Sequence, residues 1–201
     1  GIDQDHSRLK ANVDRYIYRA DDLGVVSGTR DILAHGTHVG GAVATDPMPG
    51  NNEGVSNARL HIYKIFDDDL DDMDTFRDRA GNIFIQDIHY VNSVMYRRAL
   101  AACLDENFEV INFSIGGSGQ GDSREQALYR QIAAQDQVIV AAMGNERRDG
   151  SPTSWPAAYT GVTAVGALDL NDGVAVFSNH GDHIAISAPG GRRICPRRGR
   201  P

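Results

Sequence analysis

Cysteine is scarce in this chain of 201 residues, which contains only Cys103 and Cys195. Two cysteines do not make a disulfide framework, and they do not identify a redox compartment. Long apolar runs are also missing, since none approaches the roughly 18 residues of a membrane-spanning helix. At this length we expect one domain with a substantial core, in which Cys103 would be a small buried residue of a helix.

Lysine is nearly absent as well, with only Lys10 and Lys64, so arginine carries most of the positive charge. The net charge is −7 although five of the last ten residues are arginines, so the rest of the chain is still more acidic. An acidic body argues against nucleic acid as a partner. A hydrophobic fraction of 41% with 22 glycines is typical of a globular α/β protein. The start at Gly1, with neither an initiating methionine nor a signal peptide, indicates a chain that has been cut.

Short runs rich in valine and isoleucine alternate with helical patterns along the chain. The strand-like runs span residues 60–66, 108–115, 137–142, 162–167, 174–177 and 183–187. Helical patterns span residues 35–45 and 84–104, and a third opens at Ser123 with Gln126 completing a capping box. This alternation predicts a mostly parallel sheet covered by helices on both faces, with an active site at the carboxyl ends of the strands.

One acidic segment, residues 67–74, interrupts this pattern. A solvated surface loop is one interpretation. A metal site is the other, with Asp67, Asp69 and Asp71 as candidate ligands, because clustered carboxylates suit a hard cation such as calcium. The spacing of an EF-hand is not satisfied, since Asp72 stands at the sixth position, where that loop requires glycine.

The segment HGTHVGG at residues 35–41 is the first strong functional signal. His35 and His38 are three residues apart and could bind a metal from one helix face, but no third ligand has convincing spacing. A purely structural histidine pair is a second interpretation. The third is a catalytic base at the start of a helix, whose small residues let it pack deep in the domain.

Five segments resemble the subtilisin family of serine proteases. They are HGTHV at 35–39, VINFSIGG at 110–117, VIVAAMGNE at 138–146, WPAAY at 155–159 with VTAVGA at 162–167, and FSN at 177–179 with APG at 188–190. One such match would be weak, whereas five in the family's order over residues 1 to about 190 are hard to reach by chance. The resemblance implies a three-layer α/β fold, with a mostly parallel central sheet and helices on both faces.

The resemblance also implies roles for individual residues. His35 would be the general base that takes a proton from a serine hydroxyl, since an imidazole titrates near neutrality. Asn145 would donate its side-chain amide to the oxyanion, although a turn residue beside glycine is the alternative interpretation. The Trp155–Pro156 peptide bond would be cis. The substrate would bind between a strand edge and the wall of a specificity pocket, formed respectively by Ser114, Ile115 and Gly116, and by Ala141, Ala142, Met143 and Gly144.

Some features of the family would lie outside this sequence. The catalytic aspartate and its strand would precede Gly1, and Asp3 and Asp5 match only the segment that follows that aspartate. The Gly-Thr-Ser turn with the nucleophile, and the helix after it, would follow Gly190. We therefore expect residues 1–190 to be a partial peptidase domain and the Arg- and Pro-rich residues 191–201 to be an atypical tail outside the fold.

These features predict a serine endopeptidase that acts through an acyl-enzyme when complete, whereas the chain as given is expected to be inactive. A pseudoprotease that binds peptides along residues 114–116 is the alternative. The expected partners are peptides or proteins, with no nucleic acid and no membrane, and the expected state is a monomer. Catalysis would need no cofactor. A structural calcium ion stays open, because Arg8 stands where the family often has a calcium-binding carboxylate and the loop 50–55 is short. Secretion is expected from the family alone.

Overall fold

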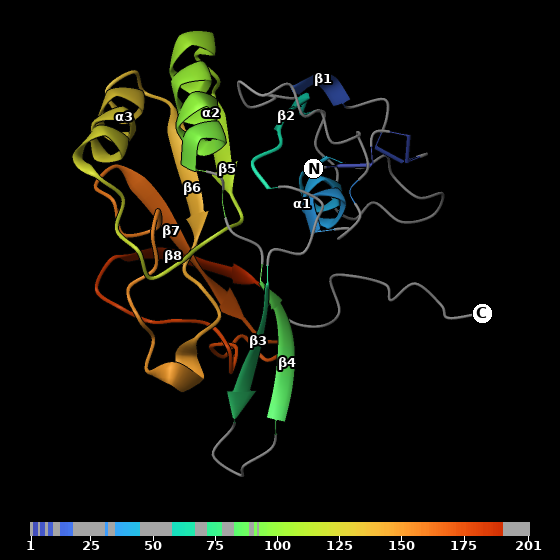
Figure 1. The fold of residues 1–201 in the computed structure, drawn as a ribbon, viewed down its shortest axis with the longest axis vertical. Helices are drawn as coiled ribbons and strands as arrows, with labels where there is room; N and C mark the ends of the chain where they lie inside the picture. The colour runs from blue at the N-terminus through green and yellow to red at the C-terminus, as the bar shows by residue number, and fades with distance from the viewer. Residues whose placement is uncertain are drawn as a thin grey trace. The chain divides into compact units, whose positions relative to one another are not determined.

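The computed structural model describes residues 2–3, 5–6, 8–9, 13–17, 31, 35–44, 58–66, 72–77, 83–88, 91 and 93–190. The chain divides into two compact units, Gly1–Ala99 and Leu100–Pro201. Each unit is described by itself below, with the element labels of Figure 1.

A parallel sheet of four strands organises the second unit (Figure 1). In spatial order its strands are β5 (Val110–Phe113), β6 (Val138–Ala142), β7 (Val162–Leu168) and β8 (Ile184–Pro189). The register places Val110 beside Val138, and Ile139 beside Val162. Branched side chains favour these strands because they pack well on a pleated surface. Since all four strands run the same way, their carboxyl ends lie at one edge of the sheet.

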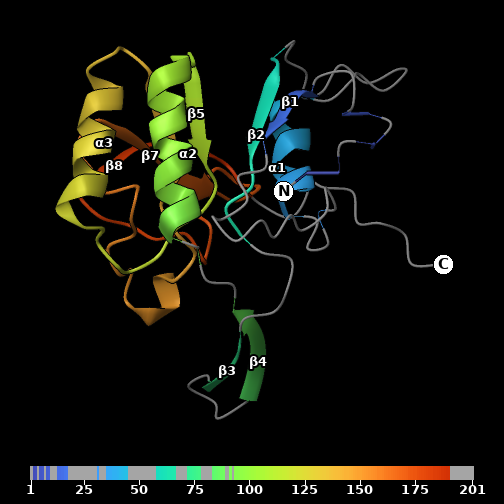
Figure 2. The same cartoon turned by 45° about the horizontal axis from the view of Figure 1, so that its top comes forward.

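Two helices lie side by side against one face of this sheet (Figures 1 and 2). They are α2 (Ser93–Glu106), whose last turns belong to the second unit, and α3 (Ser123–Ala133). Strand residues alternate accordingly: Ile111 and Ile139 are buried, whereas Val110 and Val138 are 60% and 49% exposed. The core of the second unit therefore lies between the sheet and these helices.

Helix α3 begins at Ser123, as predicted, but its cap differs from the predicted capping box. Its N-cap is Asp122, whose carboxylate accepts the backbone N–H of Arg124 at 3.0 Å and of Glu125 at 2.9 Å. Gln126 donates its side-chain N–H to the carbonyl of Gly121 at 3.0 Å. Because Asp122 is the N-cap, the predicted role of Ser123 as cap is wrong. An ionised carboxylate satisfies two backbone donors at once and suits the positive end of a helix.

An aromatic cluster attaches α3 to the rest of the second unit. Tyr129 of α3 is fully buried, and its ring centroid lies 5.7 Å from that of Phe113 and 4.7 Å from that of Tyr159. The Tyr159 hydroxyl donates to Glu125 at 3.0 Å. Burial, with the Glu125 hydrogen bond acting in the same direction, raises the pKa of Tyr159 to about 12, so the hydroxyl keeps its proton.

Among its described residues, the first unit contains helix α1, the first turns of α2 and two small sheets. Helix α1 spans His35–Val43, and the strands are β1 (Val13–Ile17) with β2 (Leu60–Tyr63), which are parallel, and β3 (Asp72–Arg77) with β4 (Ile83–Ile88), which are antiparallel. Ile2 is fully buried beside Gly40 of α1, where an added Cβ would lie 2.5 Å from Ile2 Cδ1. Glycine at position 40 thus lets the chain around Ile2 approach the helix closely.

The helix predicted over residues 84–104 is wrong in its first part. Residues 83–88 form β4, and the helix begins only at Ser93. Phe84 and Ile88 have helical spacing, but they also belong to a short run rich in isoleucine that pairs with β3 over six positions. Pairing with a partner strand overrides periodicity in a run this short.

Two other expectations also differ from the structure. Asp72 and Asp74, expected in an acidic surface loop, belong to strand β3. Residues 174–177 form no strand, because Val174 makes only an isolated bridge with Leu168. The turn before Val174 is closed by Asp169, whose carboxylate accepts backbone N–H groups from residues 171 and 173 at 2.8 and 3.0 Å. The pairing between Leu168 and Val174 is therefore limited to one isolated bridge beside this turn.

Candidate active site

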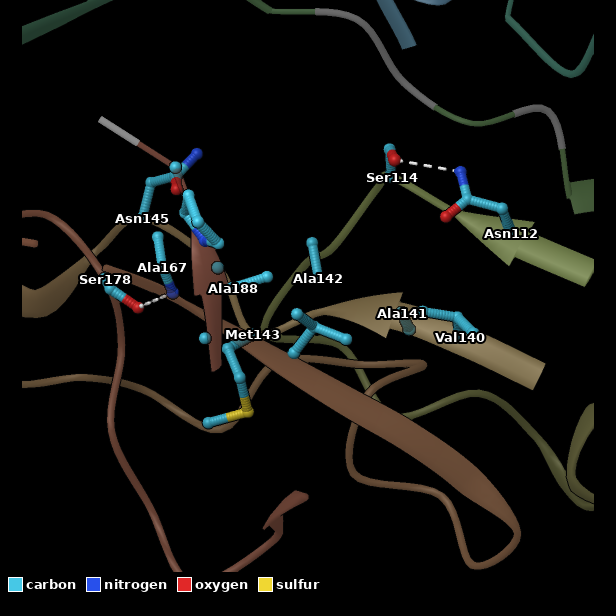
Figure 3. A pocket seen from close by; sticks show the side chains of 15 residues that line it. Asn112, Ser114, Val140, Ala141, Ala142, Met143, Asn145, Ala167, Ser178 and Ala188 are labelled. Atoms are coloured by element: carbon cyan, nitrogen blue, oxygen red, sulfur yellow. Dashed lines mark hydrogen bonds between the residues drawn. The ribbon is translucent and has the colours of Figure 1, made fainter. Parts of the chain in front are cut away.

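A pocket of about 340 Å³ lies in the second unit (Figure 3). It is lined by Asn112 and Ser114, residues 140–145, residues 165–167, Ser178 and residues 188–190. These positions follow or end strands β5, β6, β7 and β8, so the pocket lies at the carboxyl edge of the sheet, where ligands bind in parallel α/β folds. The predicted location of the site at this edge agrees with the pocket.

One predicted wall of the cleft is only partly in the pocket. Ser114 lines it and accepts a hydrogen bond from Asn112 Nδ2 at 2.9 Å (Figure 3). Ile115 and Gly116 do not line it. Gly116 instead packs against the Ser154 side chain, which an added Cβ would hit. The predicted role of Ile115 and Gly116 in substrate binding stays a prediction.

The segment after Gly116 is anchored by backbone pairing. Gly117 and Trp155 exchange two hydrogen bonds, N–H of Gly117 to the Trp155 carbonyl at 3.1 Å and the reverse at 2.8 Å. The predicted cis peptide bond between Trp155 and Pro156 is confirmed. Trp155 also lies 4.6 Å from Tyr159, ring centroid to ring centroid, which ties this bridge to the aromatic cluster.

The other predicted wall, residues 141–144, lines the pocket along its whole length. Ala141 and Met143 are 1% exposed and pack in a core cluster with Ala157 and Ala164. Met143 continues the sheet beyond β6, since its N–H donates to the Val165 carbonyl at 3.0 Å. The Met143 side chain therefore forms part of the core as well as of the pocket. The small side chains of Ala141 and Ala142 leave the pocket volume open.

Asn145 follows this wall on an exposed turn that begins with Gly144, whose φ is +98°. The backbone N–H of Asn145 donates to Glu146 Oε2 at 2.8 Å. Its side-chain amide makes no hydrogen bond within the part of the chain that the structure describes. Figure 3 shows Asn145 and Ser114 on either side of Ala142. An amide with free donors at a pocket can bind a developing negative charge.

His35 is the first residue of α1 and belongs to the first unit. Partial desolvation lowers the pKa of His35 below its ordinary value, and the negative charge of Asp31 opposes this effect. His38 also lowers the pKa of His35. The imidazole is therefore mainly neutral at neutral pH, which is the form that accepts a proton. Its pairing with the pocket of the second unit stays a prediction.

Asp31 is a residue of this region that the sequence analysis missed. Its carboxylate accepts both the backbone N–H and the hydroxyl of Thr37, each at 2.6 Å, and the Thr37 hydroxyl accepts the N–H of Asp3 at 2.7 Å. This chain of hydrogen bonds joins the segment around Asp3 to the first turn of the helix that carries His35. The available signal was an acidic residue a few positions before a helix start.

A serine–histidine contact lies outside the pocket. Ser151 Oγ and His180 Nδ1 are 2.5 Å apart, and the His180 backbone N–H also points to Ser151 Oγ at 3.3 Å. His180 is exposed and Ser151 is half-buried, and neither residue lines the pocket. No acidic group orients His180 among the described residues, so the pair lacks the third member that activates a nucleophile.

The candidate metal ligands Asp67, Asp69 and Asp71 lie outside the described residues. Within the described ranges, no three His, Cys, Asp or Glu side chains are grouped to hold a metal ion. The calcium site therefore stays a prediction, as does the tail at 191–201, which also lies outside the description. No helix in the described part of the chain has the length and apolar character to cross a bilayer.

Known proteins are similar to this chain in sequence and in fold. The sequence profile of the Subtilase family matches residues 1–199. The chain is 32% identical over 161 residues to a thermostable alkaline protease of Halalkalibacterium halodurans, covering 80% of this chain and 38% of that protein. It is 31% identical over 196 residues to a thermophilic serine proteinase of a Bacillus species, covering 94% and 42% respectively. The chain thus spans about two fifths of the length of each of these relatives.

A solved structure agrees with the sequence comparisons. The crystal structure of a psychrophilic subtilisin-like protease from an Antarctic Pseudoalteromonas superposes with a TM-score of 0.68 at 31% identity, covering 94% of this chain and 39% of that one. The predicted three-layer α/β fold with a mostly parallel sheet is confirmed by this likeness and by the sheet of the second unit. With a family profile that matches nearly its whole length, the chain belongs to the subtilase family.

Proposed function

We propose that the complete gene product is a serine endopeptidase that cleaves peptide bonds through an acyl-enzyme, and that this chain supplies its general base, oxyanion donor and substrate cleft. The observation that carries the proposal is the pocket at the carboxyl edge of the sheet, which combines Ser114, residues 141–144 and Asn145. Membership of the subtilase family supports the same activity.

In the proposed reaction, a serine oxygen attacks the substrate carbonyl carbon while the His35 imidazole takes the hydroxyl proton. The carbonyl oxygen gains the negative charge and accepts a hydrogen bond from the Asn145 side chain. Collapse of this intermediate breaks the C–N bond, and the amine leaves with the proton from His35. Water then hydrolyses the ester by the same route. The serine and the aspartate of the family's triad are expected outside this chain.

The pKa of His35 supports its role as base. An imidazole whose pKa lies below its ordinary value is neutral at pH 7, so it can accept the serine proton without first losing one. The chain of hydrogen bonds from Asp3 through Thr37 to Asp31 fixes the helix turn next to this imidazole. Both features are those of a positioned base.

Covalent labelling of the complete gene product tests the proposal. We expect an active-site fluorophosphonate probe to react with the wild type, and His35→Ala to abolish the reaction. His38→Ala, three residues along the same helix, is the matched control and should keep the labelling. Labelling that survives His35→Ala would reject the role of His35, and a wild type that neither labels nor cleaves peptides would reject the endopeptidase.

Peptide binding without hydrolysis is a second candidate function. Among the described strands, β5 stands at the end of the order β5-β6-β7-β8 and leads to Ser114, which lines the pocket, so a peptide can pair with the segment next to Ser114. We expect the 201-residue chain to bind peptides without turnover. Turnover by the complete gene product would restrict this function to the isolated chain.

A further inference from the structure

A carboxylate connects the turn of Asn145 to a buried side chain. Glu146 Oε2 accepts the backbone N–H of Asn145 at 2.8 Å and the side-chain N–H of Asn179 at 2.8 Å. Asn179 lies 33 positions after Glu146 and is only 1% exposed. Hydrogen bonds to an ionised acceptor are about twice as strong as neutral ones. Through Glu146, the exposed turn is therefore held by a residue of the interior.

The orientation of the Asn179 amide is fixed by its partners. Its Nδ2 also donates to the Pro152 carbonyl at 3.3 Å, and both partners of Nδ2 can only accept. The opposite orientation would place oxygen against oxygen at both contacts. The present one leaves Asn179 Oδ1 buried and without a hydrogen-bond partner among the described residues. The two donations thus decide the orientation, although one acceptor stays unpaired.

The backbone of the turn lies directly against this arrangement. The Asn179 N–H donates to the Gly144 carbonyl at 3.0 Å. An added Cβ at Gly144 would lie 2.5 Å from Asn179 Nδ2 and 2.5 Å from Glu146 Oε2. The turn therefore has three connections to Asn179: one backbone bond, one bond through Glu146 and the close packing of Gly144.

We propose that Asn179 and Glu146 are positioning residues that hold the side-chain amide of Asn145 where it meets the oxyanion, an inference that rests on the proposed endopeptidase function. Neither residue touches the substrate in this role. They hold the backbone of Asn145, because its N–H is bound to Glu146. The side-chain amide of Asn145 is therefore attached to a backbone whose position is fixed. A donor displaced by about 1 Å loses much of its stabilisation of the transition state.

Amide NMR of the 201-residue chain tests the contact itself. We expect Glu146→Gln to move the Asn145 backbone N–H resonance, because it replaces the carboxylate that accepts this N–H. Asn179→Ala should speed hydrogen exchange of the same N–H by about tenfold, since the carboxylate loses its anchor. Asn171→Ala, at an exposed turn of the same unit, is the matched control and should change neither signal. An Asn145 N–H unaffected by Asn179→Ala would overturn the proposal.

Kinetics of the complete gene product test the consequence for catalysis. We expect Asn179→Ala to lower kcat about tenfold with KM unchanged, which is less than the loss of a whole oxyanion donor. In an Asn145→Ala background the same change should be nearly neutral, because no donor is left to position. A general loss of structure would instead lower activity equally in both backgrounds, and that result would overturn the proposal. Glu146→Gln, at an exposed position, provides a second variant that keeps the buried residue.

The two tests separate this proposal from the proposed function. If the complete gene product cleaves no peptide, the endopeptidase is rejected, while the NMR experiment still decides whether Asn179 holds the turn. If it cleaves peptides and the double substitution is additive, the endopeptidase stands and the positioning role is rejected.

Discussion

Gly144→Ala should destabilise the chain more than any ordinary glycine substitution. Gly144 has φ +98°, a conformation that costs a residue with a Cβ about 1–2 kcal/mol. The added methyl would also lie 2.5 Å from both Asn179 Nδ2 and Glu146 Oε2. To make room for the methyl group, Asn179 Nδ2 and Glu146 Oε2 must move, which breaks the hydrogen bond between them. This loss costs a further ~1–3 kcal/mol because Asn179 is buried. Together the two effects predict a loss of about 2–5 kcal/mol.

Two other glycines separate these effects. Gly150 has φ +94° but open space around its Cβ position, so Gly150→Ala measures the conformational cost alone. Gly119 has open space and no left-handed φ, so Gly119→Ala should leave the stability almost unchanged. Urea denaturation of the three variants, compared at equal m-value, gives the free energies of unfolding. A loss for Gly144→Ala no greater than that for Gly150→Ala would refute the contact between Gly144 and the Asn179–Glu146 pair.

Three further predictions concern other sites. Thr37→Val should lower the free energy of unfolding by about 1–3 kcal/mol in urea, because the hydroxyl bridges Asp3 and Asp31, whereas Thr37→Ser should keep most of the stability. Asp31→Asn should lower the pKa of His35 still further, since it removes the negative charge that favours the imidazolium; a histidine NMR titration that shows a rise would contradict this. Burial raises the pKa of Cys103 to about 12, so iodoacetamide at pH 8 should leave the Cys103 peptide unlabelled by mass spectrometry in the native chain and label it in urea.

The sheet of the second unit could be predicted because each of its strands is a short apolar run between turn residues. The predicted runs at 108–115, 137–142, 162–167 and 183–187 contain β5 to β8 or most of them. The same reasoning failed at residues 83–88, where an apolar run fits both the 3.6-residue period of a helix and the two-residue period of a strand. Only the partner strand β3 decides between them, and that strand lies in a segment whose aspartates give no strand signal.

Within the candidate site, the sequence indicated which residues line the pocket better than it indicated their contacts with distant parts of the chain. The predicted wall at residues 141–144 and the predicted donor Asn145 both line the pocket, because they form one continuous motif. Ile115 and Gly116 were predicted in the cleft with Ser114; they do not line the pocket, and nearby Gly117 pairs with Trp155 while Gly116 contacts Ser154. Those partners are far away in the sequence, so no local pattern could reveal them.

The residues that hold the turn of Asn145 could not be predicted either, because their contacts also join positions far apart in the sequence. Glu146 is next to Asn145 in the sequence, yet its partner Asn179 is 33 positions further on and looks like an ordinary polar residue after a strand-like run. What distinguishes Asn179 is its near-complete burial together with an oxygen that no described residue satisfies. Burial of an amide side chain costs free energy unless it is hydrogen-bonded, and the bond from Asn179 Nδ2 to Glu146 offsets part of that cost, while the Asn179 backbone N–H binds the Gly144 carbonyl. Asn179→Ala is therefore the substitution that tests whether the interior of the fold controls the exposed donor.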